Sequence, residues 1–470
     1  MLGVVFKDKW ILLLIPAAIA MVILGVIVSP VLSLIALLAC SVIAFFLNDD
    51  QLFCLLVGLM PFGNIFKADA DAFSYFTLLE IVVLAVLLLR NKTFSPFFTA
   101  GFTLLAFFLF LGNVCGLSSD LMDIVKLLLH LVLLYLFSQR LSIDGINKAI
   151  FYLTIALITA LILSLIDEFY FLVDSYFDNK ELRVETMLGT DMIRRCSGLF
   201  NDPNYCSVAI ITNISLLMVQ YYYRYSGLEF WIFLAVLVPM GMLTYSKSYF
   251  LVIIVLLVLF YLFVLIPRHR VMAVLATVAG AALVYFALLG EFESVNIILD
   301  RLSIRGDITT GRMDLLEYYV NYLSQNTDAL LFGRGISAQP LFGQVFVHNF
   351  PVDMVYRIGV VGSAGFLFVL WRAFPKCSFK KLRPAHFIPS ICLFVMYFFL
   401  AGVTSYDFWY YFVLCFAAFK MSELVEEKPD GFLKKLQKLL AKPSHKVKYR
   451  QKEYPYVKCA EKDSEPSPLS

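Results

Sequence analysis

The sequence has few charged residues. Only 16% of its 470 residues are Asp, Glu, Lys or Arg, whereas about 25% is usual for a soluble domain. The lysines and arginines flank apolar runs instead of gathering on one polar face, which excludes the pattern of a nucleic-acid-binding protein. A chain of this composition is not a soluble globular protein.

The nine cysteines follow neither a metal-ligand spacing nor a disulfide framework. Four of them lie in apolar runs, namely Cys40, Cys54, Cys392 and Cys415. We expect these to pack as small hydrophobic residues. Cys196 and Cys206 flank one polar loop and could pair in an oxidising compartment, although two cysteines of nine are a weak signal.

What the sequence has instead is a series of apolar runs, and stretches of roughly 20 such residues mark membrane spans. The runs lie near 10–28, 31–47, 52–62, 73–89, 97–113, 124–138, 149–166, 205–223, 229–245, 249–266, 271–290, 350–371, 386–404 and 408–422. Several are short, and 52–62 could be re-entrant. The fold class that we predict is all-α: a polytopic integral membrane helical bundle of 12–14 spans, with 14 preferred.

Two long polar segments, 167–204 and 291–348, interrupt the apolar runs. They divide the chain into N-terminal membrane helices (1–166), a region that holds both long loops (167–371), C-terminal membrane helices (372–422) and a basic tail (423–470). Lys and Arg mark alternate short connections, at Arg90 and Lys92, Arg140 and Lys148, Arg224, Arg268 and Arg270, and from Arg372 to Arg383. By the positive-inside rule, both termini are cytoplasmic and both long loops face outward.

Both long loops nevertheless contain arginines, on the side where such residues are usually scarce. Arg194 and Arg195 precede the turn-rich segment 197–204, and Arg305 and Arg312 lie in the second loop. Guanidinium groups bind phosphate through two parallel hydrogen bonds and stay charged at any working pH. The pattern favours an anionic ligand between the loops; ordinary solvated loop charge is the alternative.

His348 stands where the second loop enters an apolar helix that we expect to begin near Phe350. The positive end of a helix dipole disfavours the imidazolium ion, so the ring stays neutral. A neutral imidazole with a pKa near the working pH suits a general base. A structural role is the alternative. Asp353 lies about 140° away from His348 on an ideal helix and is a poor candidate for orienting the ring.

A second histidine, His130, lies inside the sixth run, four residues after Lys126. That spacing puts both side chains on one helix face. Polar groups inside a membrane usually face the interior of the bundle. We weigh two interpretations: a contact with a lipid phosphate or substrate, and a satisfied polar pair in the interior.

Short motifs in the region of the two loops resemble those of the O-antigen ligase and Wzy-type polymerase superfamily, in the same order. The segment 195–204 (RCSGLFNDPN) resembles the family's R-x-S-G-x-F-x-x-P-N. The segment 244–248 (TYSKS) resembles T-x-S-R, with Lys247 where Arg is usual. The ordered motifs cover about 170 residues, and the rest resembles the family only as a helical scaffold.

The second loop continues the resemblance. Gly311-Arg312 is similar to the family's Gly-Arg pair, and 331–335 (LFGRG) to its L-x-G-x-G turn. His348-Asn349 followed by Gly359 and Gly362 resembles H-N-x9-G-x-x-G. Each motif is weak by itself; their order and their placement on one face carry the resemblance.

The resemblance implies a glycosyltransferase that moves a glycan from an undecaprenyl-pyrophosphate-linked donor to a sugar hydroxyl of an acceptor glycan. Arg195 and Arg312 would contact the pyrophosphate, with Arg194 and Arg305 as further candidates. His348 would deprotonate the acceptor hydroxyl for inverting attack at the anomeric carbon, without a metal or cofactor. Supporting positions would be Asn204, Lys247 and Asn349, although Lys247 cannot form the planar fork of an arginine.

The resemblance further implies a multi-pass protein of the bacterial cytoplasmic membrane (inner or plasma), with its active site on the outer face. The lipid bilayer and other polysaccharide assembly proteins would be its partners. Polymerases and ligases share these motifs, so acceptor, sugars and linkage stay open; we prefer a polymerase because that role exists in every bacterial envelope type. A flippase for lipid-linked sugars is the rival, and a structural subunit of an assembly complex is a third possibility.

Overall fold

A computed structural model of the chain describes residues 9–69, 73–90, 94–115, 121–174, 185–188, 191–200, 202–223, 227–266, 270–288, 312–341, 347–377, 381–398, 400 and 406–423. Every element below lies between Lys9 and Glu423, within one compact unit. Of the predicted tail, only Glu423 lies within the described residues.

Each apolar run of the sequence coincides with a helix. In the N-terminal part these are α2 (Lys9–Ile27), α3 (Pro30–Ala44), α4 (Asp49–Leu59) with the 3-10 turn η1 (Met60–Phe62), α5 (Tyr75–Arg90), α6 (Pro96–Cys115), α7 (Leu121–Arg140) and α8 (Ile143–Ser164). The later ones are α10 (Pro203–Tyr222), α11 (Leu228–Met242), α12 (Lys247–Phe260) with the π-helical η3 (Tyr261–Leu265), α14 (Arg270–Leu288), α18 (Phe350–Ala373), α19 (Pro384–Phe398) and α20 (Tyr406–Ala418) with η6 (Phe419–Glu423).

Among the described residues, five helices are long and apolar enough to cross a membrane: α7, α8, α10, α12 together with η3, and α18. Other apolar helices are shorter, including α3, α11 and α19. Large apolar side chains such as Phe46 (83% exposed) and Leu89 (72%) point away from the protein interior, as in a helix that faces lipid. A helical membrane bundle fits these features, and the number of spans stays a prediction.

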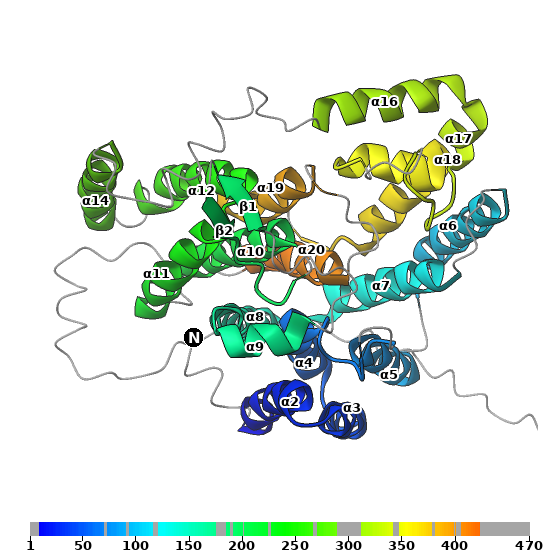
Figure 1. The fold of residues 1–470 in the computed structure, drawn as a ribbon. Coiled ribbons are helices and arrows are strands. Elements are labelled where there is room, and N and C mark those ends of the chain that lie inside the picture. The colour runs from blue at the N-terminus through cyan, green and yellow to red at the C-terminus, as the bar shows by residue number, and fades with distance from the viewer. Residues whose placement is uncertain are drawn as a thin grey trace, which may run out of the picture. The chain divides into compact units, whose positions relative to one another are not determined.

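The part of the chain that the structure describes is helical, as predicted, apart from one short β-hairpin. The first long loop contains the short helix α9 (Asp167–Asp174) and a hairpin of two antiparallel strands, β1 (Glu185–Leu188) and β2 (Asp191–Arg194), with Glu185 paired to Arg194. In the view of Figure 1 the hairpin overlaps α10 and α12. Its strands are only four residues each, too short for an alternating pattern to be recognised in the sequence.

Helix α10 is the central element, since 94% of its most apolar 18-residue stretch is buried. It packs against α8, α11, α12, α19 and α20. Polar side chains link it to α8, since Thr154 Oγ1 donates to Asn213 Oδ1 at 3.0 Å and Gln220 Nε2 to Asn147 Oδ1 at 3.0 Å. Such groups are costly in lipid and join helices when they meet in the interior. These bonds fix α10 and therefore the residues at its N-terminus.

Contacts between segments distant in sequence gather at two ends of the bundle. At the first, which we call the loop end, Asn64 Nδ2 donates to the Leu199 carbonyl at 3.0 Å, and Ser337 Oγ to Asp123 Oδ2 at 2.9 Å. At the other, the basic end, Arg140 Nη1 lies 3.1 Å from Asp49 Oδ2. The described parts of the two long loops therefore lie at the same end of the bundle, and the side of the membrane that this end faces stays a prediction.

The described part of the second loop forms two helices, α16 (Arg312–Gln325) and α17 (Thr327–Phe332), which pack on α18. Figure 1 shows both helices beside α18. The ring of Tyr319 meets that of Tyr356 edge-on at 5.0 Å between centroids, in a small hydrophobic cluster with Leu323, Ala329 and Leu341. Arg312 is the first residue of α16.

Candidate functional site

The side chain of Arg195 is held by two neighbouring segments. It is only 7% exposed; its Nε donates to the Thr244 carbonyl at 2.9 Å and its Nη2 to Asn204 Oδ1 at 3.4 Å. Thr244 lies in the turn before α12, and Asn204 lies in the first turn of α10. The fold therefore sets the position of this guanidinium group through residues of two motif segments, 195–204 and 244–248.

The turn between α11 and α12, residues 243–246, has an unusual backbone conformation. Tyr245 has φ +46°, a left-handed conformation that few residues other than glycine adopt. Side-chain hydrogen bonds hold the turn against α10: Ser207 Oγ donates to Thr244 Oγ1, and Ser246 Oγ to Asn204 Oδ1, both at 2.9 Å. Backbone strain maintained by surrounding contacts often marks a functional site.

Asp202 is the N-cap of α10. Its Oδ1 accepts a hydrogen bond from the backbone N–H of Asn204 at 2.5 Å, and Pro203 occupies the first turn, where its missing N–H is tolerated. The carboxylate is favourable at the positive end of the helix dipole. Its negative charge acts on two residues of the second loop, Arg312 and His348. Asp202 therefore links the two loops electrostatically.

His348 lies directly before α18, half-buried at the loop end. Asn349 caps this helix, since its Oδ1 accepts from the Val352 N–H at 3.1 Å, and the helix begins at Phe350 as predicted. Burial lowers the pKa of His348, the positive charge of Arg312 lowers it further, and Asp202 opposes both effects. The lowered pKa was predicted from the helix dipole, but burial is the largest cause in the structure.

Arg312 is the first residue of α16 and is also half-buried. Burial lowers the pKa of its guanidinium group, and the negative charge of Asp202 opposes that shift. An arginine keeps its charge even so, because its ordinary pKa lies far above neutrality. The loop end thus brings a cation, a carboxylate and an imidazole within electrostatic reach of one another.

The L-x-G-x-G turn holds α18 where that helix is broken. Gly359 has φ +69° inside α18, which interrupts the regular hydrogen bonds. The turn supplies replacement donors, since the N–H of Arg334 donates to the Tyr356 carbonyl at 2.8 Å and that of Gly335 to the Arg357 carbonyl at 2.9 Å. The short first part of α18, which carries His348 at its start, is therefore fixed by the second loop.

Asp353 forms a buried ion pair within this first part of α18. Its Oδ1 lies 2.8 Å from Nε of Arg357. Nη1 of the same arginine donates to the Ile336 carbonyl. Asp353 is 1% exposed and Arg357 8%. The carboxylate is thus engaged by Arg357, as the angular argument against a role in orienting His348 suggested.

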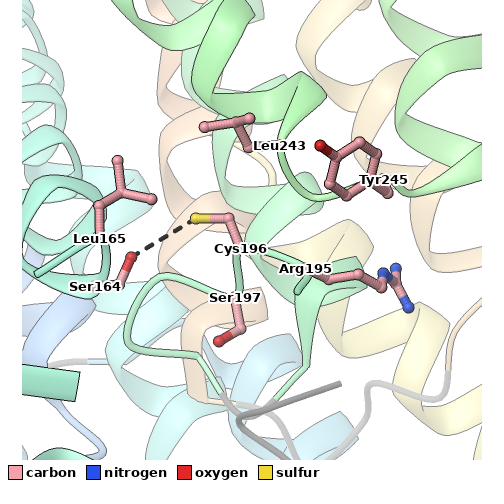
Figure 2. A pocket seen from close by; sticks show the side chains of 7 residues that line it. All are labelled: Ser164, Leu165, Arg195, Cys196, Ser197, Leu243 and Tyr245. Atoms are coloured by element: carbon pink, nitrogen blue, oxygen red, sulfur yellow. Dashed lines mark hydrogen bonds between the residues drawn. The ribbon is translucent and has the colours of Figure 1, made fainter. Parts of the chain in front are cut away.

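A cavity of about 120 Å³ lies behind Arg195 (Figure 2). Its lining also includes Ser164, Cys196, Leu243 and Tyr245, and Ser164 Oγ lies 3.6 Å from Cys196 Sγ. Neither Arg312 nor His348 is among its lining residues, and it is far too small for a lipid-linked glycan. We assign this cavity to packing around the loop and not to substrate binding.

The remaining predicted site residues fall in several places. Lys247 is the half-buried first residue of α12, beside the strained turn. Arg194 ends strand β2, where the structure describes the backbone alone. Arg305 lies outside the described residues. Among all the residues that the structure describes, no three His, Cys, Asp or Glu side chains gather as the ligands of a metal would.

His130 has a different partner from the one expected. Its Nε2 lies 3.0 Å from Oε1 of Glu80, which also accepts from the Tyr410 hydroxyl at 2.6 Å. Lys126 instead lies 3.8 Å from Asp123. His130 is 3% exposed and Glu80 is fully buried, so the interpretation as a satisfied polar pair in the interior describes this site. The partner is 50 positions earlier in the chain, beyond the range of helical spacing.

Sequence reasoning missed the contribution of Asp202. It was treated only as part of the turn-rich segment 197–204, although an acidic residue directly before a proline is a recognisable helix start. Its effect on Arg312 and His348 has no local signal, because those residues lie more than 100 positions later in the sequence.

Comparisons with known proteins identify no family: no family model, no curated protein and no solved structure matches the chain.

Proposed function

We propose that the protein is a membrane glycosyltransferase of the O-antigen ligase and Wzy-type polymerase superfamily, acting on the outer face of a bacterial cytoplasmic membrane. It transfers a glycan from an undecaprenyl-pyrophosphate carrier to a sugar hydroxyl, as a polymerase or a ligase of envelope polysaccharide. The observation that supports this best is the coupling of His348 to Arg312 and Asp202 at the end of the bundle where Arg195 is held.

In the proposed reaction, the neutral imidazole of His348 accepts the proton of the acceptor hydroxyl. The oxygen then forms a bond to the anomeric carbon of the donor while the bond from that carbon to the pyrophosphate oxygen breaks. Inversion follows from this single displacement. The lowered pKa of His348 supports the first step, because an imidazole that holds its proton weakly is unprotonated at neutral pH.

Arginine has a separate part in this proposal. The leaving carrier pyrophosphate gains negative charge in the transition state, and preorganised cations lower the energy of such a charge. Arg195 is positioned by Thr244 and Asn204 before any ligand arrives, and Arg312 lies within the electrostatic reach of His348. We propose that Arg195 and Arg312 bind the pyrophosphate of the donor.

The direct test is transfer by the purified full-length chain, with an undecaprenyl-pyrophosphate-linked glycan as donor and a glycan as acceptor. Loss of transfer in His348→Ala, with normal expression and unchanged melting, is the expected result. Full activity of that variant contradicts the proposal. Glycan chain lengths in a deletion strain then separate the two subtypes: loss of long chains means a polymerase, and intact chains left on the carrier mean a ligase.

One observation favours the rival transporter. Glu80 and His130 form an ionisable pair buried in the helical bundle, and such pairs occur in proton-coupled transporters. Cysteine labelling separates the hypotheses. Substitutions to Cys at 195, 312 and 348 that react only from the outside support the enzyme, whereas accessibility that alternates between the two sides supports transport.

A further inference from the structure

Two thiols meet beneath the loop that carries Arg195. The Cys206 side chain forms a hydrogen bond with that of Cys196, although the structure describes both as reduced. Both are buried, Cys196 at 8% and Cys206 at 0% exposure. A disulfide needs its sulfur atoms about 2.05 Å apart. Two side chains already in hydrogen-bond contact require only a short approach to reach that distance.

The backbone around the two thiols is held from several sides. The Cys196 N–H donates to the Leu243 carbonyl at 2.8 Å, which joins the loop to the turn before α12. Gly198 has φ +61°, and a Cβ built there would lie 3.3 Å from Cys206 Sγ. The loop backbone therefore lies directly on the Cys206 thiol, and the two cysteines stay together in the folded chain.

We propose that Cys196 and Cys206 form a disulfide that fixes the Arg195 loop onto α10. Arg195 directly precedes one of these cysteines, and its partner Asn204 lies two residues before the other. The bond would close a ring of residues 196–206 that contains Asn204 and directly follows Arg195, so both partners of the Arg195–Asn204 contact would be held beside it. The proposal depends on the outward placement of the loop end given under Proposed function, and not on the transfer reaction.

The chemistry is thiol–disulfide exchange with an extracytoplasmic protein disulfide oxidant. One cysteine thiolate attacks a sulfur of the oxidant's disulfide, and the second then attacks the mixed disulfide. The two cysteines lose two protons and two electrons in total, and the oxidant leaves as a dithiol. Because the folded pair is buried, the exchange takes place before the loop has closed over Cys206.

Differential thiol tagging tests the bond in the full-length chain. Cells are lysed directly in SDS with N-ethylmaleimide, which blocks every free thiol. The protein is then reduced, and the thiols released from disulfides react with a polyethylene-glycol maleimide that slows the protein on a gel. We expect two tags on most wild-type chains and none on Cys196→Ser or Cys206→Ser. The control Cys377→Ser, a half-exposed cysteine after α18, should keep both tags.

Wild-type chains without tags overturn the proposal, and so do two tags on either single variant. Both readouts are independent of glycan transfer, so a failed disulfide and a failed enzyme assignment are distinguishable. Melting supplies the second measurement. Reductant should lower the melting temperature of the wild type and leave the Cys196→Ser/Cys206→Ser variant unchanged; an equal response of the two contradicts a stabilising bond.

Discussion

Gly333 and Gly359 lie at one close contact between two backbone segments, and neither position has room for a side chain. A Cβ at Gly333 would lie 2.3 Å from the Arg357 carbonyl oxygen and 2.6 Å from the Gly359 nitrogen. A Cβ at Gly359 would lie 2.3 Å from the Leu331 carbonyl oxygen. Two glycines from separate motifs thus form one close backbone contact, which holds the first part of α18 and with it His348.

Replacing either glycine should therefore destabilise the protein and weaken catalysis. Both have a positive φ with ψ near 180°, a region essentially confined to glycine. Gly333→Ala or Gly359→Ala should cost about 1–3 kcal/mol for the strained backbone and about 1–3 kcal/mol for the overlap. Thermal melting and the transfer assay measure the two effects.

Gly365 is the matched control on the same helix. A Cβ there would meet nothing closer than Leu105 at 3.8 Å, an ordinary contact. Gly365→Ala should be neutral or stabilise by roughly 0.5–1 kcal/mol, because alanine favours helix interiors. Equal melting of Gly365→Ala and Gly359→Ala would refute the close backbone contact.

Removing the proposed base should reduce transfer without unfolding the protein. His348→Ala or His348→Gln should lower the rate by about 10²- to 10⁴-fold, the usual contribution of a general base. Single-turnover kinetics with saturating donor isolates the chemical step. His445→Ala, in the C-terminal tail, is the control and should keep the wild-type rate. A loss of less than a few-fold at His348 argues against the base assignment.

The neighbours of His348 should move its pH profile in opposite directions. A base works when it is unprotonated, so transfer is lost as the pH falls through the pKa of His348. Asp202 raises this pKa, and Asp202→Asn should therefore shift the acid limb of kcat/KM to lower pH. Arg312 lowers it, and Arg312→Gln should shift the limb to higher pH.

Both substitutions are expected to keep the fold. Asparagine is as good an N-cap as aspartate, so α10 still begins at Pro203 in Asp202→Asn. Arg312→Gln should also raise the KM for the donor, because a proposed pyrophosphate contact is lost. Shifts of the two variants in the same direction, or no shift in either, would disprove the electrostatic coupling of the two loops.

The buried Glu80–His130 pair separates the two functional hypotheses. Glu80→Gln keeps an oxygen acceptor but replaces the carboxyl group, so it should lower stability by about 1–3 kcal/mol as hydrogen bonds to Tyr410 and His130 weaken. An enzyme whose chemistry lies at the loop end should keep its transfer rate in detergent. A proton-coupled transporter would lose translocation, measured as movement of a labelled carrier lipid across proteoliposomes.

Local patterns in the sequence were enough to locate much of the candidate site. Pro203 and Pro351 favour helix starts, and the helices that include them begin where the apolar runs predict. The same patterns put Arg195, Arg312 and His348 next to helices of one bundle end. Short spacings determine these features, because capping and apolar periodicity depend on residues within a few positions of one another.

Local sequence patterns did not predict which side chains interact across the fold. His130 was expected beside Lys126, four residues away, but it pairs with Glu80 from another helix. The interior is costly for both groups unless each finds a partner, and a partner can come from any helix that packs against theirs. The β1–β2 hairpin was missed for the opposite reason, since its strands are too short to show a pattern.

By itself, the sequence determined a helical chain with apolar runs, two polar loops and helix starts at their ends, because each of these depends on neighbouring residues. Only the tertiary structure decided that Asp202 lies within electrostatic reach of Arg312 and His348, that Gly333 contacts Gly359, and that two thiols meet under the Arg195 loop. Those contacts join segments separated by many positions, and the packing of α10 and α18 selects them.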